Sequence, residues 1–335
     1  MRHKPDSPKF TVSEPVDHSM NNALTLKDFY FGRGSEDIYS NAEHFAGKTV
    51  EDYDPSNTDD VVFRFRSDWD GKDCLELLKS HLNSDRGAST KDIVIGSWSE
   101  EMYEKSSSDV ISALVEYKDT LQNLKSLYLG DIVSEENEMS WIVQTDMAPI
   151  LENFPQLEYL RTRGSISLGF NVSQHDNLRA LALETGGLDV SVLRSISTAT
   201  LPALEHLELW LGTEEYGGSC SIEDLQPILS GDVFPKLRYL GIRNYDGIDA
   251  ACSFIVNSPI VKQLDVLDLS LGTLTDIGAR ALLNIPTNTS LKTLILNHHF
   301  MSNELIEQLN KLPFDVQLRD AQQDDDGWRF VAIGE

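Results

Sequence analysis

A leucine pattern that recurs seven times constrains the fold of this chain more than any other feature of its sequence. Each copy reads L-x-x-L-x-L, with the last position relaxed to Thr162 in the second copy and to Ile242 in the fifth. The copies begin at Leu124, Leu157, Leu178, Leu204, Leu237, Leu264 and Leu291. The six steps from the first of these leucines to the last average about 28 residues, which indicates a repeat protein rather than two ordinary domains.

The repeat predicts both the elements and their curvature. The last two apolar positions of each copy are two residues apart, so both point to one face of a short strand. Segments of helical length follow the strands, for example Leu188–Ser197 and Asp276–Asn284. Because strands lie ~4.8 Å apart and packed helices need ~8–10 Å, stacked units curve with the strands inside. The sequence therefore predicts an α/β leucine-rich-repeat solenoid, with parallel strands on the concave face and helices on the convex face.

The chain divides into four parts on this reading. Residues 1–45 are polar with no sustained period, and we expect a polar arm or loose cap. Residues 46–90 hold an apolar strand and a helical pattern, which predicts an N-terminal capping unit. The solenoid occupies residues 91–318. Residues 319–335 hold an acidic turn and the alternating segment Trp328–Ile333, which we predict to be a capping strand over the sheet edge.

Composition narrows the classes of partner and the compartment. The 335 residues include 28 Lys+Arg and 54 Asp+Glu, for a net charge of −26. An acidic chain is repelled by nucleic acid phosphates and anionic lipids, so we predict no nucleic acid, no membrane and a protein partner. The cysteines Cys74, Cys220 and Cys252 show no C-x-x-C spacing, and the basic start of the chain precedes no apolar run. Both observations favour a reducing, cytoplasmic location.

The residues beside the second and third leucines of each copy point away from the core and line the concave face. Arg161 and Arg163 should lie beside Glu184, and Trp210 should be exposed beside Arg243. An exposed tryptophan flanked by arginine is typical of a binding hot spot. The alternative is a solvated face on which the charges pair with one another. The predicted partner-binding residues of the concave face are Tyr128, Arg161, Arg163, Glu184, Glu208, Trp210, Arg243 and Asp268.

The loops after the strands emerge at one end of the sheet, where ligands of open parallel sheets tend to bind. The predicted partner-binding residues of this loop rim are Asp131, Glu135, Glu214, Glu215, Tyr216, His298 and His299. Carboxylates and imidazoles are metal-ligand types. However, His298 follows a strand about six places from that of Asp131, or ~25–30 Å away, so one shared site is implausible. We therefore predict an acidic, solvated rim and no metal site.

The sequence contains no motif that indicates catalysis. It has no G-x-S-x-G, H-E-x-x-H or G-x-x-x-x-G-K-[ST] string, and no cysteine has a persuasive histidine partner. We predict that the protein is not an enzyme, with no catalytic residue and no cofactor.

Several longer strings resemble a known family. They are LYLGDIVSEENEMSWI at Leu127–Ile142, LELWLGTEEYGG at Leu207–Gly218 and LDLSLGTLTD at Leu267–Asp276. The chain resembles an uncharacterised bacterial family of cytoplasmic leucine-rich-repeat proteins over roughly residues 46–335. The resemblance implies a repeat horseshoe and no established activity or catalytic residues. Family members tend to be encoded near a radical-SAM-type enzyme, an ATP-grasp-like protein and a phosphatase-superfamily hydrolase, which implies a scaffold or accessory role in a modification pathway.

Three functional hypotheses stay open. The first is a non-catalytic protein-binding or scaffold module that uses the concave sheet and the post-strand loops. The second is a metal- or small-molecule-dependent enzyme or accessory subunit on the loop rim, which a deep pocket around Glu214, Tyr216 and His298 would favour. The third is an acidic immunity or decoy protein, which predicts a basic partner and binding that weakens with salt.

Overall fold

In the described part of the chain, one 12-stranded sheet with its strands in chain order forms the concave layer. The computed structural model describes residues 39–68, 70–99, 101, 104–324 and 327–334. The first two strands pair antiparallel and all later neighbours pair parallel. The strands are β1 (His44–Phe45), β2 (Lys48–Asp52), β3 (Val62–Phe65), β4 (Asp92–Ile95), β5 (Ser126–Leu129), β6 (Tyr159–Arg163), β7 (Ala180–Glu184), β8 (His206–Gly212), β9 (Tyr239–Tyr245), β10 (Val266–Asp268), β11 (Thr293–Ile295) and β12 (Asp315–Gln317).

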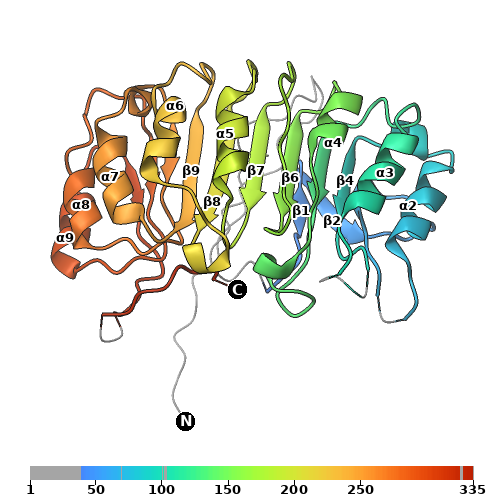
Figure 1. Ribbon diagram of the computed structural model, residues 1–335, viewed down its shortest axis with the longest axis horizontal. Helices are drawn as coiled ribbons and strands as arrows, with labels where there is room; N and C mark the ends of the chain where they lie inside the picture. Colours follow the sequence, from blue (N-terminus) through green and yellow to red (C-terminus); the bar gives the residue numbers. More distant parts are fainter. Residues whose placement is uncertain (1–38, 69, 100, 102–103, 325–326, 335) are drawn as a thin grey trace, which may run out of the picture.

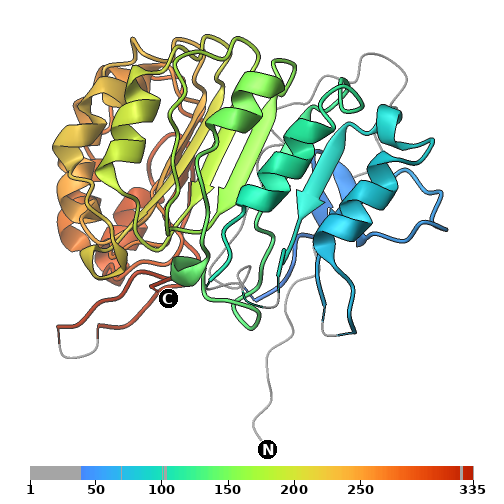
Figure 2. The ribbon, with the colours of Figure 1, turned by 45° about the vertical axis from the view of Figure 1, so that its right-hand side comes forward.

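The helices form a second layer on the outer side of the curved sheet (Figures 1 and 2), which confirms the predicted solenoid. They are α2 (Cys74–Leu82), α3 (Ser108–Glu116), α4 (Ala148–Asn153), α5 (Val190–Thr198), α6 (Gln226–Leu229), α7 (Ile248–Val256), α8 (Asp276–Leu282) and α9 (Asn303–Leu309). No helix lies between β6 and β7, all of whose linking residues are described, because this is the shortest step of the repeat. Among the described residues, no helix is long and apolar enough to cross a membrane.

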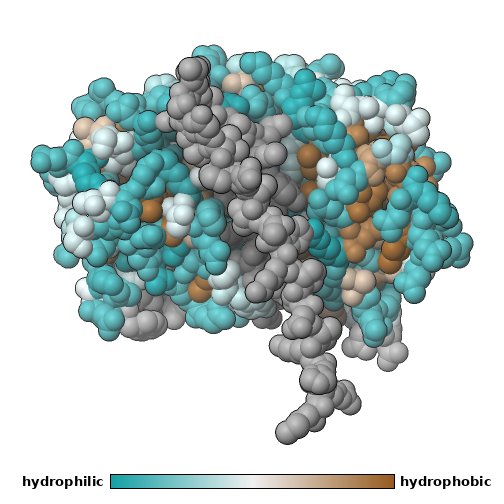
Figure 3. Space-filling view, turned by 180° about the vertical axis from the view of Figure 1, so that it is seen from behind, coloured by the Kyte–Doolittle hydropathy of each residue, from teal (hydrophilic) through white to brown (hydrophobic). Residues whose placement is uncertain are grey.

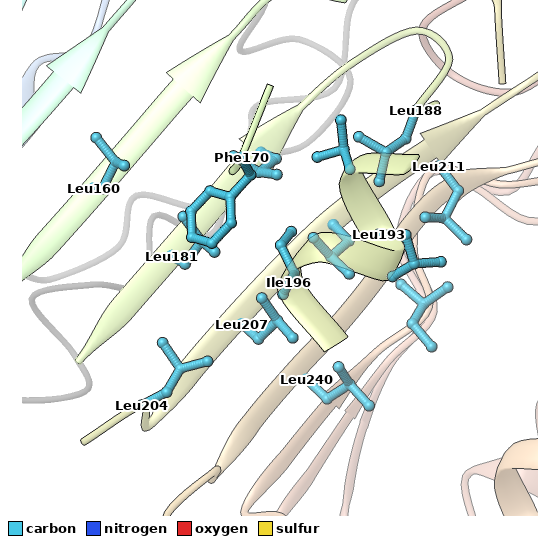
Figure 4. Close-up of a cluster of buried hydrophobic side chains, with 14 of the residues drawn as sticks. Leu160, Phe170, Leu181, Leu188, Leu193, Ile196, Leu204, Leu207, Leu211 and Leu240 are labelled. Atoms are coloured by element: carbon cyan, nitrogen blue, oxygen red, sulfur yellow. The ribbon is translucent and has the colours of Figure 1, made fainter. Parts of the chain in front are cut away.

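The repeated leucines form an in-register ladder between the two layers. Leu160 pairs with Leu127 on one side and with Leu181 on the other, and Leu207 pairs with Leu240 further along the sheet. All five side chains are fully buried. Figure 4 shows how the leucines of neighbouring strands and the inner face of α5 fill one cluster. Each buried leucine stabilises the fold by about 1.5–3 kcal/mol, so the ladder is the main source of stability.

The end of the chain differs from the expected capping strand. β12 is the last strand of the sheet in the described part of the chain, and the residues from Gly327 onward return towards the middle of the molecule (Figure 1). There the amide of Ala332 donates to the carbonyl of Leu271, at 2.8 Å. Ile333 is buried in a small apolar cluster at this place, which an edge strand beyond β12 would not offer it.

A buried histidine holds the N-terminal part of the solenoid. His81 of α2 packs edge-on against Tyr53 and Phe63, and its Nε2 lies 2.8 Å from Thr90 Oγ1. Burial, helped by the positive charge of Arg86, lowers the pKa of His81 to about 4. The folded protein therefore keeps this ring neutral at pH values where a free histidine is charged.

Replacing His81 by glutamine should make the free energy of unfolding less dependent on pH between about pH 4 and pH 6.5. The lowered pKa means that the unfolded chain takes up the proton first as the pH falls, so the folded state loses stability across this window. Denaturant unfolding at several pH values measures the slope. The matched variant Ser80→Ala, at an exposed position of the same helix, removes no titratable group and should keep the wild-type slope. An equal slope in both variants would contradict the assignment.

Candidate functional site

The parallel register places the predicted concave residues in rows across the sheet. Tyr128 lies opposite Arg161, which lies two strands away from Glu208 in the same row. In the next row, Arg163 lies opposite Glu184 and Trp210 lies opposite Arg243. The predicted neighbours are therefore confirmed.

The first group of charges on this face is the Glu184 cluster, which consists of Glu184, Arg161, Arg163 and Tyr128. Glu184 forms ion pairs with both arginines: its Oε1 with Arg161 Nη2, and its Oε2 with Arg163 Nε at 2.7 Å. Arg163 also donates through Nη1 to the carbonyl of Ile132, at 2.7 Å. The guanidinium of Arg161 lies over the ring of Tyr128, 5.0 Å from its centroid. One carboxylate thus holds two guanidinium groups from the adjacent strand.

The second group is the Glu208 cluster, which consists of Glu208, Trp210, Arg243 and Asp268. Glu208 Oε1 accepts from Trp210 Nε1 at 2.7 Å and from Arg243 Nη1 at 2.6 Å. Arg243 Nε also lies 3.3 Å from Asp268 Oδ2, and its guanidinium lies 4.9 Å from the centroid of the Trp210 ring. Tyr239 donates its hydroxyl to Asp268 at 2.8 Å. The cluster joins three strands through one arginine.

The prediction that this face is exposed to solvent is wrong. Trp210 is 1% exposed, Arg243 3% and Arg161 1%. The other predicted residues of the face, Tyr128, Arg163, Glu184, Glu208 and Asp268, are also buried. The charges therefore pair with one another inside the protein, and the tryptophan does not present its ring to solvent.

Segments near both ends of the described chain cover parts of the face. At the N-terminal side, the ring of Phe45 stacks on Tyr159 at 5.0 Å between centroids and lies 5.9 Å from Tyr128. At the C-terminal side, Ile333 packs in one apolar cluster with Trp210. Figure 3 views the molecule from this side and shows hydrophobic residues gathered over its C-terminal half. A sequence pattern of period two finds this face but not the distant segments that close it.

Burial shapes the electrostatics of the Glu208 cluster. Burial opposes the charge of Glu208, but the nearby positive charges outweigh it, Arg243 foremost, and hold the pKa of this carboxyl well below its usual range. Burial also lowers the pKa of His206, which stacks on Tyr239 with 3.9 Å between ring centroids. Glu208 therefore stays ionised over the physiological range, as a carboxylate in a structural ion-pair network does.

Three of the predicted rim residues are buried and not at the surface. Asp131 is fully buried, where its Oδ2 pairs with Arg64 Nε at 2.8 Å and its carboxylate accepts from the amide of Ala42. His298 is 8% exposed and His299 is fully buried. The Nε2 of His298 lies 3.1 Å from the carbonyl of Phe330. Asp131 thus holds the segment at Ala42 and His298 lies against the segment at Phe330, so neither side chain belongs to a solvated rim.

The other predicted rim residues stay accessible. Glu135, Glu214 and Glu215 are exposed, and Tyr216 is half-buried. The last three form a short 3₁₀ turn, Glu214–Tyr216, after β8. A cavity of about 400 Å³ opens beside this turn, and we call it the rim cavity. It is lined by Leu211, Gly212, Thr213, Glu214, Gly218, Ser219, Cys220, Tyr245 and Asp246.

The rim cavity contains residues that the sequence analysis missed. Tyr245 is the last residue of β9 and Asp246 follows it, just as Gly212 is the last residue of β8 and Thr213 follows it. This equivalent position in the next repeat is the sequence signal that could have identified both residues. Burial raises the pKa of Asp246, and the negative charge of Glu214 adds to the effect. Among the described residues, no lysine or arginine lines the cavity, so its mouth has no positive charge from that part of the chain.

A second cavity, of about 370 Å³, lies where β3 and β4 begin, at the edge of the sheet opposite the loop rim. It contains both acidic and basic side chains, and Lys48 is already paired with Asp60 at 2.7 Å. Across the described ranges there is no group of three or more His, Cys, Asp or Glu placed to hold a metal ion. His298 does not line the rim cavity, so the structure does not bring it together with Glu214.

Comparisons with known proteins place the chain in a family. No family model and no curated protein matches it. Among solved structures, an internalin from Listeria monocytogenes shares 16% identity over 71% of this chain and 56% of that one, with a TM-score of 0.39. A Bacteroides fragilis protein solved by a structural genomics consortium shares 32% identity over 80% of this chain and 76% of its own, with a TM-score of 0.72. The chain belongs to the family of this Bacteroides fragilis protein. That membership supports the fold and assigns no activity.

Replacing Glu184 by glutamine should destabilise the protein by about 3–5 kcal/mol. The variant keeps the shape of the side chain but removes the charge that Arg161 and Arg163 share. Denaturant unfolding measures the loss. The matched variant Glu215→Gln, on the exposed 3₁₀ turn, should change the free energy of unfolding by no more than about 0.5 kcal/mol. Equal stability of the two variants would show that the Glu184 cluster contributes nothing.

Proposed function

We propose that this protein is a non-catalytic protein-binding or scaffold module that binds a basic partner at its loop rim. The rim cavity is the observation that carries the proposal. It combines exposed carboxylates at Glu214 and Asp246 with the partly buried ring of Tyr245, and none of the described residues that line it is basic. A lysine or arginine side chain from a partner would complete this set through charge and through contact with the aromatic ring.

The fold and the overall charge support the same proposal. Curved repeat sheets offer extended binding surfaces, and members of this fold class commonly bind proteins. A net charge of −26 attracts a basic partner over a distance. Salt screens this attraction, so it weakens as the ionic strength rises. The concave residues predicted from the sequence are buried in ion-pair clusters. We therefore expect the partner to bind at the rim and not at the centre of the concave face.

The other two hypotheses differ from this one in the kind of ligand or in the effect of binding. An acidic immunity or decoy protein would also bind a basic partner, and it would suppress the activity of that partner. An enzyme or accessory subunit on the rim would use the cavity beside Glu214 for a small molecule, and the size of that cavity is the observation that favours it. An accessory role in a modification pathway is implied by the family resemblance and forms part of the present proposal.

Reversing the charge of the rim cavity should abolish partner capture. The variant Glu214→Lys/Asp246→Lys removes the attraction for a basic side chain, and we expect at least a tenfold loss of captured partner from native lysate. Mass spectrometry after cross-linking identifies the partner, and wild-type capture should weaken between low and physiological salt.

The matched control is Glu152→Lys/Glu307→Lys, which changes the net charge equally at exposed positions of the outer helices α4 and α9. It should capture the partner as well as the wild type, apart from a modest effect of net charge. If both double variants lose the partner equally, long-range charge and not the rim cavity decides binding. If neither loses it while both stay folded, the partner binds elsewhere and the proposal fails.

A further inference from the structure

The last described residues occupy a site on the solenoid in the way a bound peptide would. Val331 and Ile333 are buried, at 7% and 2% exposed, while Trp328 and Phe330 are 70% and 66% exposed. We propose that the surface under Ile333 is a peptide-binding site, which the chain's own end fills and which an extended segment of a partner protein fills after displacing it. This site is distinct from the rim carboxylates and does not rest on the proposed function.

The side chain of Asn244 forms hydrogen bonds with both backbone groups of Ile333. The amide of Asn244 donates through Nδ2 to the carbonyl of Ile333 at 2.6 Å, and its Oδ1 accepts from the amide of the same residue at 3.0 Å. Asn244 is fully buried and has a φ of 51°, a left-handed conformation that asparagine tolerates better than most residues. A paired contact to the N–H and C=O of one residue recognises an extended chain whatever its side chain.

Three further polar contacts fix the direction of the segment. The amide of Ala332 donates to the carbonyl of Leu271 at 2.8 Å, and Ser140 Oγ donates to the carbonyl of Gly334 at 3.2 Å. On the other side, His298 Nε2 lies 3.1 Å from the carbonyl of Phe330. The solenoid groups come from strand β9 itself and from the segments after β5, β10 and β11, so the site exists only in the folded solenoid.

One apolar pocket supplies the side-chain preference. Ile333 packs with Met139, Trp210 and Leu271. A small residue fits best at the next position: a Cβ on Gly334 would lie 3.1 Å from Tyr216 Cε2, and the tyrosine ring would have to move by a few tenths of an ångström. The site therefore favours an extended segment in which an aliphatic residue precedes a small one. Trp210, which the sequence suggested as a binding hot spot, forms part of this pocket.

The attachment is short enough to be displaced. Of the described residues in this segment, residues 330–334 make these contacts, and a tethered segment of this kind competes with an effective concentration of about 1 mM. A partner segment with additional contacts elsewhere on the solenoid can exceed that value. The rings of Trp328 and Phe330 are already exposed, so the segment leaves without having to withdraw them from the core.

A labelled peptide tests the site in the full chain. The probe is a synthetic peptide with the sequence of residues 328–335 and a fluorophore at its N-terminus, and anisotropy reports its binding. In the variant Ile333→Glu the chain's own end is released, so the peptide should bind at least tenfold more tightly than to wild-type protein. The same peptide with glutamate in place of the isoleucine should not bind. Equal binding of the probe to wild type and variant would overturn the proposal.

A second variant removes the Asn244 carboxamide that binds the backbone of Ile333. Asn244→Gly keeps the positive φ without strain and loses the amide, so Asn244→Gly/Ile333→Glu should bind the probe at least tenfold more weakly than Ile333→Glu alone. Circular dichroism checks that each variant is folded. If Ile333→Glu unfolds, hydrogen exchange of the Ile333 amide in wild-type protein takes its place. Unlabelled peptide at several millimolar should speed that exchange several-fold, and an unchanged rate would also overturn the proposal.

Discussion

The fold depends on the in-register stacking of one leucine ladder. Because each strand pairs parallel with the next in the same register, equivalent positions of all repeats meet in rows. The inner rows bury leucine beside leucine. The same register sets side chains of the opposite face ~4.8 Å apart, so charges on neighbouring strands must be complementary. Arg163 opposite Glu184, and Arg243 between Glu208 and Asp268, satisfy this requirement.

Complementary charges allow the concave face to be closed. Burying an isolated charge costs several kcal/mol, and pairing with good geometry offsets that cost. Glu184 and Glu208 each hold at least one arginine, so Phe45 and Ile333 can cover parts of the face without stranding a charge. In the described part of the chain, the two surfaces that we propose for a partner are the loop rim and the site filled by residues 330–334. They differ in chemistry: the proposed ligand of the rim cavity is a cationic side chain, and that of the second site is an extended apolar segment.

Much of the architecture follows from local pattern. The spacing of the leucines predicts the strands, the helices after them and the direction of curvature, since each depends on periodicity within about 28 residues. The pattern also predicts which concave side chains are neighbours, because register is set by the repeat itself. Around the rim cavity, Glu214 is a predicted rim residue, whereas Asp246 and the cavity itself are not predicted, although Asp246 follows β9 at a comparable offset.

The sequence by itself determined the solenoid, its rows of side chains and the pairing of Arg163 with Glu184, because all of these repeat at short range along the chain. Only the tertiary structure decided whether those rows face solvent. Asp131 meets Ala42 across 89 residues, and Asn244 meets Ile333 across another 89. Such contacts join segments that share no repeat and no periodicity, so no local pattern encodes them. They turn a predicted open binding face into an interior and place the exposed surface at its rim.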